Sequence, residues 1–337
     1  MELLEDNAGA VEAQLKTSGW IAPDERITHL EKAGVGNMNR TLRARLRLKS
    51  GGARSLILKQ SVPFVARYPE IPAPLGRLAV EAAFYREIET YPSLTRYTPH
   101  ILGYDPDNNL LCMEDFGPAA DFSSYYDLSR RSEEVADQIP GSELIAWLGA
   151  LHTLQPTDPV FENLEMRELS RQHIFEIPFD PENSLVLDPA ITDIQARFRS
   201  DSALKKAAGA LGEIYMSRSS HDSPDVLLHG DFYPGSWLRH EETVVKIIDP
   251  EFGFRGPPEF DIGIFFAHMT MIGYPQAALL DLLQNYEAPV GFNFQLALGF
   301  AGVEIIRRLL GVAQLPLQAS ATTLRLWLES AQGLITA

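Results

Sequence analysis

Two short stretches of the sequence place polar residues where a buried strand would end. In LLHGDFYPGSWL, Leu227 to Leu238, His229 and Asp231 follow two leucines and precede a Pro-Gly-Ser turn. Burying a His and an Asp costs free energy unless they are paired, bind a metal or take part in chemistry. This stretch alone leaves two interpretations open: a buried pair that braces the loop, or a reactive pair.

The second stretch, VVKIIDPEF, carries Asp249 and Glu251 two residues apart, so in an extended chain both carboxylates leave the same face. Two close negative charges need a cation, and Mg²⁺ fits best because no cluster of Cys or His is available for a transition metal. The alternative is a capping or salt-bridged pair at a strand end. If the two stretches pair as a hairpin, Asp231 and Ser236 meet these carboxylates at one end of it.

A second set of charges lies in the first third of the chain. Lys59 ends an apolar strand on the same face as Ile57, and Glu81 falls on the apolar face of the following helix. An ion pair between them would explain both charges and would leave the ammonium able to hold nucleotide phosphates. The alternatives are a solvent-exposed strand-end lysine and a glutamate on the helix surface. The loop GVGNMN, with Gly34, Gly36 and Asn37, precedes the hairpin that carries the lysine.

The elements that position these residues change type along the chain. Before Phe116, period-two alternation and turns predict an antiparallel sheet with one helix, over residues 41–49, 54–60, 76–91, 100–105 and 109–115. After it, helical periodicity dominates in 142–154, 195–216 and from 260 to the end, apart from the paired strand-like runs 225–231 and 243–252. We therefore predict an α+β fold with an antiparallel-sheet N-lobe, 1–116, and a mainly helical C-lobe, 117–337.

The amino-acid composition limits the classes of molecule that the protein is expected to bind. The 337 residues contain 29 Lys plus Arg against 45 Asp plus Glu, a formal net charge of −16, which disfavours nucleic acid and acidic membranes. The N-terminus lacks the pattern of a signal peptide, no apolar run is long enough to span a membrane, and the single cysteine, Cys112, suits a reducing compartment. We expect a cytoplasmic protein with a small-molecule substrate; its oligomeric state is left open, with a homodimer as one option.

The order of these motifs resembles a known superfamily. A Gly-rich loop, a strand Lys, a helix Glu, MEDF, HGD and IDPEF follow one another as in the protein-kinase-like phosphotransferases that act on aminoglycosides and choline. Within that superfamily the chain is most similar to the 5-methylthioribose kinases, through HGDFYPGS, DPEFGFRGPPEFDIG and GFAGVEIIRRLLGVAQ. The resemblance spans roughly residues 33–313 and implies a two-lobed, protein-kinase-like fold and an ATP- and Mg²⁺-dependent kinase. It also implies that the N-lobe binds nucleotide and that the C-lobe is catalytic and binds the phosphate acceptor.

The resemblance also implies residue roles. Asp231 would be the catalytic base, and Asp249 would hold Mg²⁺ with Glu251 as a second carboxylate. His229 would brace the loop, and Ser236 stands where most of the superfamily has a metal-binding Asn. The remaining nucleotide contacts would come from the Gly-rich loop, the Lys-Glu pair and two backbone positions: Gly34, Gly36, Asn37, Lys59, Glu81, Glu114 and Phe116.

An arginine pair bears on the phosphate acceptor. Arg307 and Arg308 interrupt an apolar helix, and Glu304, within one turn of both, allows the alternative of a surface ion pair. The resemblance favours contact with the substrate, 5-methylthioribose or a related sugar. An aminoglycoside or amino-alcohol kinase is the second option, since an acidic chain suits a cationic acceptor, and a nucleotide-binding pseudokinase is the third. The residues FYP after HGD depart from the small polar residues usual in methylthioribose kinases and put the acceptor in question.

Overall fold

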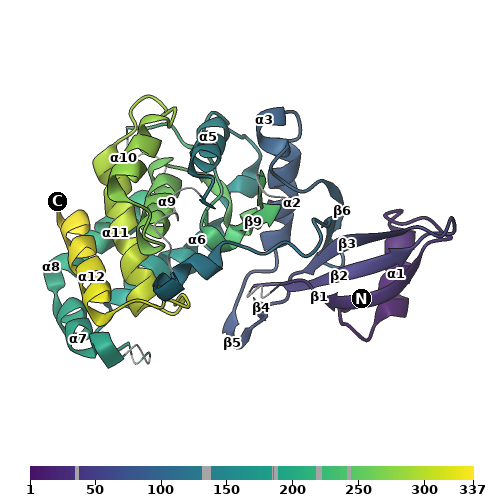
Figure 1. The fold of residues 1–337 in the computed structure, drawn as a ribbon, viewed down its shortest axis with the longest axis horizontal. Coiled ribbons are helices and arrows are strands. Elements are labelled where there is room, and N and C mark those ends of the chain that lie inside the picture. Colours follow the sequence, from purple (N-terminus) through teal and green to yellow (C-terminus); the bar gives the residue numbers. More distant parts are fainter. Residues whose placement is uncertain (35–37, 131–137, 184, 186–188, 218–221, 241–243) are drawn as a thin grey trace. The chain divides into compact units, whose positions relative to one another are not determined.

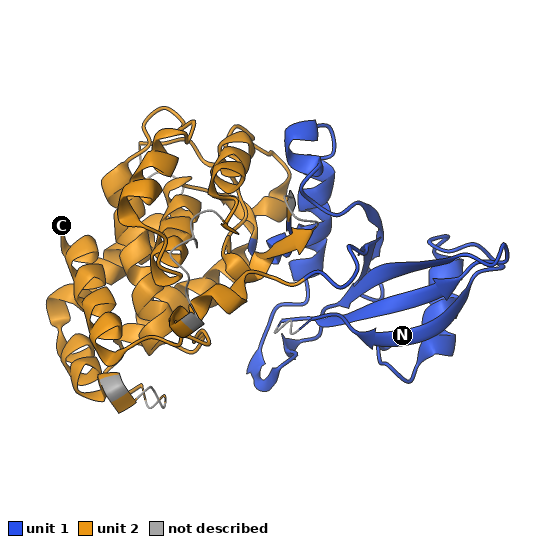
Figure 2. Ribbon diagram, viewed as in Figure 1, with its two compact units in different colours: residues 1–119, 246–252 blue, residues 120–245, 253–337 orange. Residues whose placement is uncertain are grey.

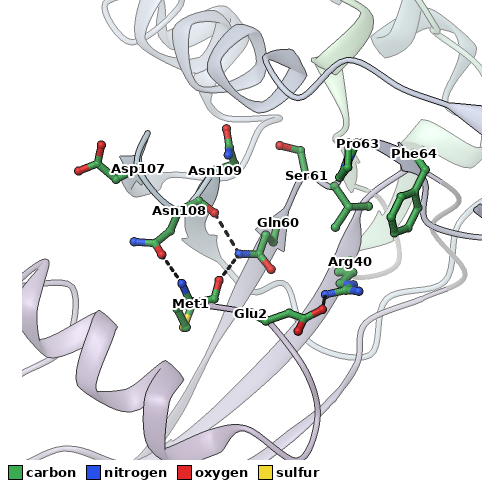
Figure 3. A pocket seen from close by; sticks show the side chains of 11 residues that line it. Met1, Glu2, Arg40, Gln60, Ser61, Pro63, Phe64, Asp107, Asn108 and Asn109 are labelled. Atoms are coloured by element: carbon green, nitrogen blue, oxygen red, sulfur yellow. Dashed lines mark hydrogen bonds and ion pairs between the residues drawn. The ribbon is translucent and has the colours of Figure 1, made fainter.

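The chain forms two compact units in the computed structural model, which describes residues 1–34, 38–130, 138–183, 185, 189–217, 222–240 and 244–337 (Figure 2). Unit 1 comprises residues 1–119 and 246–252, and unit 2 comprises residues 120–245 and 253–337. The division lies three residues beyond the predicted one at Phe116. The segment 246–252, which the prediction gave to the C-lobe, groups with unit 1.

Unit 1 is built on a five-stranded antiparallel sheet in the order β1-β2-β3-β7-β6 (Figure 1). The strict alternation of leucines and arginines produces the central hairpin, in which Thr41 lies opposite Lys59. A short hairpin, β4-β5, follows it. The strands are β1 (Arg26–Lys32), β2 (Arg40–Arg47), β3 (Ala53–Gln60), β4 (Phe64–Val65), β5 (Tyr68–Pro72), β6 (Ile101–Asp105) and β7 (Leu110–Glu114).

Helices pack against the sheet, in which β2 directs its leucines to one face and most of its arginines to the other. Helix α1 (Ala8–Thr17) buries Val11 and Leu15 against the face formed by leucines such as Leu42 and Leu58. Lys59 therefore points to the opposite face. Helix α2 (Arg77–Glu87) packs against β6, β7 and the turn of residues 250–252, and a short helix α3 (Pro92–Thr95) follows it.

Unit 2 is mainly helical. Its helices are α5 (Gly141–Leu151), α6 (Leu164–Arg171), α7 (Thr192–Ser200), α8 (Ser202–Met216), α9 (Glu259–Met271), α10 (Gln276–Gln284), α11 (Phe294–Leu310) and α12 (Ala321–Thr336). The helical segment predicted over 195–216 is present as two helices, α7 and α8, which are divided at Asp201. The side chain of Asp201 accepts hydrogen bonds from the backbone N–H groups of Ala203 and Leu204 and so caps α8. This sheet-plus-helix composition confirms the α+β class.

Close helix packing in unit 2 depends on glycines. A Cβ at Gly263 of α9 would lie 2.7 Å from the carbonyl oxygen of Ala297 on α11. A Cβ at Gly302 of α11 would lie 2.7 Å from the carbonyl oxygen of Ala331 on α12. Helix α11 is thus packed between α9 and α12 at backbone distance, which fixes the side chains that it carries.

The strand pairing predicted around the HGD motif is wrong. Strand β8 (Val226–Leu228) pairs with β11 (Phe254–Gly256), whereas β10 (Val244–Ile247) pairs with β9 (Trp237–His240). A turn is expected between the two runs at His240 to Glu242, and residues 241 and 242 of it lie outside the described residues. Apolar runs of similar length are interchangeable partners at the sequence level, because each buries its side chains equally well in either pairing.

Candidate active site

In unit 1, Lys59 lies at the centre of a buried charge cluster. Its ammonium donates to Glu81 Oε1 at 2.7 Å and also contacts the carboxylate of Asp249. Lys59 is 5% exposed and Glu81 is fully buried, so the alternatives of a solvent-exposed lysine and a helix-surface glutamate are wrong. The ion pair expected from the sequence is present, and nucleotide binding by it remains a prediction.

The cluster carries more negative than positive charge. Burial on its own lowers the pKa of Lys59, but the carboxylates of Asp249 and Glu81 outweigh it and hold that pKa above its ordinary value. Among the described residues, Glu81 Oε2 has no hydrogen-bond partner although it is buried. The side chain of Asp249 is 37% exposed, so this is the carboxylate that a cation from solvent can reach.

The prediction that Asp249 and Glu251 leave the same face of an extended chain is wrong. Strand β10 ends at Ile247, Asp249 adopts a left-handed backbone conformation with φ of 65°, and residues Pro250–Phe252 form a 3-10 turn. The turn directs Glu251 into the interior, where its Oε2 accepts from Asn39 Nδ2 at 2.8 Å. Burial raises the pKa of Glu251 to about 7, although Lys59 and Arg77 oppose the shift.

Arg77 is a buried cation that the sequence analysis missed. Its Nε lies 3.3 Å from Glu251 Oε2 and donates to Asn39 Oδ1 at 2.8 Å. Its Nη2 donates to the carbonyl of Met38 at 2.7 Å, so it joins the end of the Gly-rich loop to the turn after Asp249. The signal was present: Arg77 precedes Glu81 by four residues and therefore shares its helix face.

The other predicted nucleotide contacts are placed less completely. Gly34 has a φ of 76°, which favours glycine, whereas Gly36 and Asn37 lie outside the described residues. The N–H of Glu114 donates to the carbonyl of His100 at 2.8 Å, at the end of β7. Phe116 lies two residues further on, with Lys246 Nζ 4.9 Å from the centre of its ring. Adenine binding by these backbone positions stays a prediction.

In unit 2, the loop that carries Asp231 is held in place by the carboxylate of Asp261. Gly230 has a φ of 83°, and its N–H and that of His229 donate to the two carboxylate oxygens of Asp261 at 3.0 and 2.7 Å. His229 is fully buried, its ring packs against Trp147, and its Nδ1 lies 3.4 Å from the N–H of Asp231. This geometry is that of a bracing histidine.

Asp261 is itself positioned by a tyrosine and a histidine. His152 Nε2 lies 3.4 Å from Asp261 Oδ2, and His152 Nδ1 lies 2.7 Å from the hydroxyl of Tyr286. Asp261, in the motif EFDIG, was not among the site residues predicted from the sequence. A carboxylate on the apolar helix α9 was the available signal, since such a residue needs buried donors.

The arginine pair lies against Asp231. Arg308 Nη2 donates to Asp231 Oδ1 at 2.9 Å, and Arg307 Nη1 lies 3.8 Å from the same oxygen. Both arginines also pair with Glu304, through bonds of 2.5 and 3.0 Å. Glu304 is fully buried, so the alternative of a surface ion pair is wrong. Burial would raise the pKa of Glu304, but the two guanidinium charges hold it well below its ordinary value.

Ser236 is also in unit 2, in the 3-10 turn Pro234–Ser236. It is 2% exposed, and its hydroxyl donates to the backbone carbonyl of Asp231 at 3.0 Å. In this arrangement the serine closes the loop around Asp231. Its role as a metal ligand is not tested and remains a prediction.

The carboxylates of this site can hold Mg²⁺ only if ligands from outside the protein, such as phosphate oxygens and water, complete its coordination. Within the part of the chain that the structure describes, no group of three or more His, Cys, Asp or Glu side chains is arranged to hold a metal ion. Protein Mg²⁺ sites commonly use one or two carboxylates completed by phosphate oxygens and water. The exposed carboxylate of Asp249 suits such a site better than Glu251, which Arg77 and Asn39 already engage.

Comparison with known proteins settles the family. A family model described as the phosphotransferase enzyme family matches residues 45–296. The chain belongs to this family. Methylthioribose kinase from Exiguobacterium sibiricum is 28% identical over 342 residues, which cover 89% of this chain and 83% of the relative. Methylthioribose kinase from Pectobacterium atrosepticum is 28% identical over 285 residues, covering 81% of this chain and 66% of the relative.

A solved structure shows the same fold. The choline kinase LicA from Streptococcus pneumoniae aligns with a TM-score of 0.52 at 11% identity, covering 97% of this chain and 98% of its own. These findings confirm the expected superfamily, the two-lobed kinase-like fold and the class of enzyme, a small-molecule kinase that uses ATP as co-substrate. None of the helices in the described residues is long and apolar enough to cross a membrane.

Proposed function

We propose that this phosphotransferase transfers the γ-phosphoryl group of ATP to a hydroxyl of 5-methylthioribose or a closely related sugar. The names of the two methylthioribose kinases support the substrate. The observation that carries the proposal is the contact of Arg308 with Asp231, 2.9 Å between Nη2 and Oδ1. A carboxylate oriented by a buried guanidinium is suited to accept the proton of an attacking hydroxyl.

Unit 1 supplies the groups for the nucleotide. In the proposal, Lys59, kept charged by Glu81 and Asp249, binds phosphate oxygens, and the Gly-rich loop and the backbone of Glu114 and Phe116 bind the rest of the nucleotide. Mg²⁺, held by Asp249 together with the phosphates, would neutralise charge on the transferring group. Glu251 acts on the metal only indirectly, through the Asn39 and Arg77 contacts that fix the turn after Asp249.

The arginine pair discriminates between the acceptor classes. Two guanidinium groups beside Asp231 already engage the carboxylates with which a cationic aminoglycoside or amino alcohol would pair. They also offer fixed donors to sugar oxygens and to the charge on the transferring phosphoryl group. The neutral sugar is therefore favoured, and a cationic acceptor becomes an outcome of the test.

The test measures ADP release with ATP, Mg²⁺ and a panel of acceptors: 5-methylthioribose, ribose, choline, ethanolamine and several aminoglycosides. Phosphorus NMR of the product identifies the new phosphate ester. We expect turnover with methylthioribose at a kcat/KM at least tenfold above that of any cationic acceptor. Turnover with the cationic acceptors alone would overturn the substrate assignment. ATP binding without turnover on any acceptor would support a pseudokinase.

The metal assignment is tested separately. Asp249→Asn should abolish turnover and keep the fold, because it removes the exposed metal carboxylate. Glu251→Gln should retain a normal Mg²⁺ requirement with slower turnover if Glu251 positions the turn, and should raise the requirement if it is a ligand. Both are read from kcat as a function of Mg²⁺ concentration. Unchanged Mg²⁺ dependence and full activity of Asp249→Asn would remove the metal from this residue.

A further inference from the structure

Two buried hydrogen-bond relays, each made of a tyrosine, a histidine and a carboxylate, meet the loop of Asp231. In the first, described above, Tyr286 and His152 lead to Asp261, whose carboxylate accepts from the backbone of the HGD motif. In the second, the hydroxyl of Tyr126 lies 2.6 Å from His268 Nδ1, and His268 Nε2 lies 3.0 Å from Glu304 Oε1. This second relay ends at Arg307 and Arg308, which in turn contact the side chain of Asp231.

The direction of the hydrogen bonds in the second relay follows from the protonation states of Glu304 and His268. Glu304 is ionised, since its pKa lies well below the ordinary value, so it can only accept. His268 must then donate from Nε2. Burial lowers the pKa of His268 to about 4, although Glu304 opposes the shift, so the ring is neutral and its Nδ1 accepts. Tyr126 is therefore the donor to Nδ1, and the ring has one tautomer and one orientation.

The charges at the end of the second relay balance only when all four charged side chains are present. Glu304 and Asp231 carry two negative charges, and Arg307 and Arg308 carry two positive charges. Arg307 and Arg308 are 8% and 6% exposed and Glu304 is fully buried, so solvent cannot replace a missing partner. Arg308 also lies over the ring of Tyr233, with its guanidinium carbon 4.8 Å from the ring centre, and the same ring packs 5.3 Å from His268.

We propose that Glu304, held in place by His268 and Tyr126, is a positioning residue that fixes Arg308 on the carboxylate of Asp231. The inference rests on the proposed function, in which Asp231 is the base. Tyr126 comes from the 3-10 segment Ser123–Tyr126, His268 from α9 and Glu304 from α11. Three elements distant in sequence thus combine to orient one guanidinium. Tyr233, of the unusual FYP sequence, forms the wall against which that guanidinium lies.

The kinetic test compares three relay variants with a control. His268→Leu removes both hydrogen bonds of the ring, His268→Gln keeps an N–H donor for Glu304, and Tyr126→Phe removes only the hydroxyl. Tyr215→Phe is the control, because Tyr215 is also a buried tyrosine of unit 2 but its hydroxyl is hydrogen-bonded to Ser170 and to no member of the relay. Measurements are kcat and KM for acceptor and for ATP, with the melting temperature of each variant.

We expect His268→Leu and Tyr126→Phe to lower kcat at least fivefold, with KM for ATP within twofold of the wild type. His268→Gln should recover kcat to within about threefold, and Tyr215→Phe should lower the melting temperature while leaving kcat within twofold. A purely structural relay predicts another pattern: normal kcat in every variant that remains folded. That pattern would overturn the proposal, as would an equal loss of kcat in Tyr215→Phe.

A second measurement does not depend on the acceptor. In protein labelled with ¹⁵N-arginine, the Nε–H signal of Arg308, assigned with Arg308→Lys, should exchange slowly with solvent because Nε donates to Glu304 at 2.5 Å. Exchange at least tenfold faster in His268→Leu and Tyr126→Phe, but not in Tyr215→Phe, supports the positioning role even if methylthioribose is not the substrate. Unchanged exchange in both relay variants would overturn it whatever the substrate is.

Discussion

At the scale of single residues, burial decides what each charged group does. Lys59, Glu81, Glu304 and Arg308 all look like misplaced charges in the sequence, and all prove to be buried and paired. Removing one member of such a pair leaves the other as an uncompensated charge, which commonly costs about 3–5 kcal/mol. Variants at these positions should therefore affect stability as well as activity.

Lys59→Met tests this for the nucleotide cluster. We expect a loss of stability of about 3 kcal/mol, because the substitution leaves Glu81 buried without its cation, and we expect ATP binding to be lost. The double variant Lys59→Met, Glu81→Gln should recover at least half of the stability and none of the ATP binding. Urea unfolding and calorimetric titration with an ATP analogue measure the two effects. An unchanged unfolding midpoint in the single variant would mean that Lys59 is not buried in solution.

The arginine pair is tested by comparing its two members. Arg308→Ala and Arg307→Ala should each lower the kcat/KM for the sugar at least about tenfold, equivalent to about 1.4 kcal/mol of transition-state binding. The loss should be larger for Arg308, whose contact with Asp231 is the shorter. ATP affinity without acceptor should barely change. Normal sugar phosphorylation by both variants would contradict the assignment.

His268 predicts a dependence of stability on pH. Its pKa is about 4 in the folded protein against 6.5 ordinarily, so between these values the unfolded chain binds more protons. The stability associated with neutral His268 is present above about pH 6.5 and is lost as the pH falls towards 4. His268→Gln should reduce this loss between pH 7 and 4 by at most about 3 kcal/mol. Parallel stability–pH curves for wild type and variant, from urea titrations, would refute the shift.

At the scale of elements, helix α11 determines where Glu304 and the arginines lie. Its approach to α9 requires a glycine at position 263, where a Cβ would meet Ala297 O at 2.7 Å and Ala301 N at 3.0 Å. These contacts are with backbone atoms, which cannot turn aside as a flexible side chain can. A substitution at this position should therefore move α11 and with it the groups beside Asp231.

Gly263→Ala should cost about 1–3 kcal/mol of stability and also lower kcat, because overpacking at this crossing displaces α11. Gly209→Ala is the matched control: this glycine lies inside helix α8, and a Cβ there meets nothing within 4 Å. It should leave activity unchanged and stabilise the protein by about 0.4–1 kcal/mol. Thermal melts and steady-state kinetics distinguish them, and equal behaviour of the two variants would show that the crossing tolerates a methyl group.

At the scale of the whole molecule, unit 1 is discontinuous in sequence. Its last segment, residues 246–252, supplies Asp249 to Lys59 and Glu251 to Arg77, and the N–H of Ile247 donates to the carbonyl of Tyr97 at 2.7 Å. A fragment that ends at residue 119 therefore buries two cations without part of their counter-charge.

The fragment 1–119 should consequently be unfolded or loosely folded, with no cooperative thermal transition by circular dichroism. The same fragment with residues 246–252 appended through a glycine-rich linker should regain a cooperative transition, because both carboxylates return. Appending a version of this segment with Asp249→Asn and Glu251→Gln should fail to restore it. If fragment 1–119 melts cooperatively by itself, the segment is not needed for the folding of unit 1.

Local sequence patterns were enough to predict the main elements and most of the chemical groups of the site. Alternation over residues 41–60 fixed the central hairpin, since a one-residue slip would expose every buried leucine. The spacing from Lys59 to Glu81 sufficed for their ion pair, because each charge lay on an apolar face with few other partners. The motif order was enough to indicate a small-molecule kinase.

Tertiary structure alone decided which groups meet. Contacts between residues distant in sequence determine the actual strand partners of β8 and β10 and the left-handed backbone at Asp249. Such contacts also determine the engagement of Glu251 by Arg77 and Asn39. The same holds for the relay from Tyr126 to Arg308. Local patterns report which face of an element is buried, because that depends on neighbouring residues in the same element. They do not report the partner across the interface, because many partners of similar size and polarity satisfy the same face equally well.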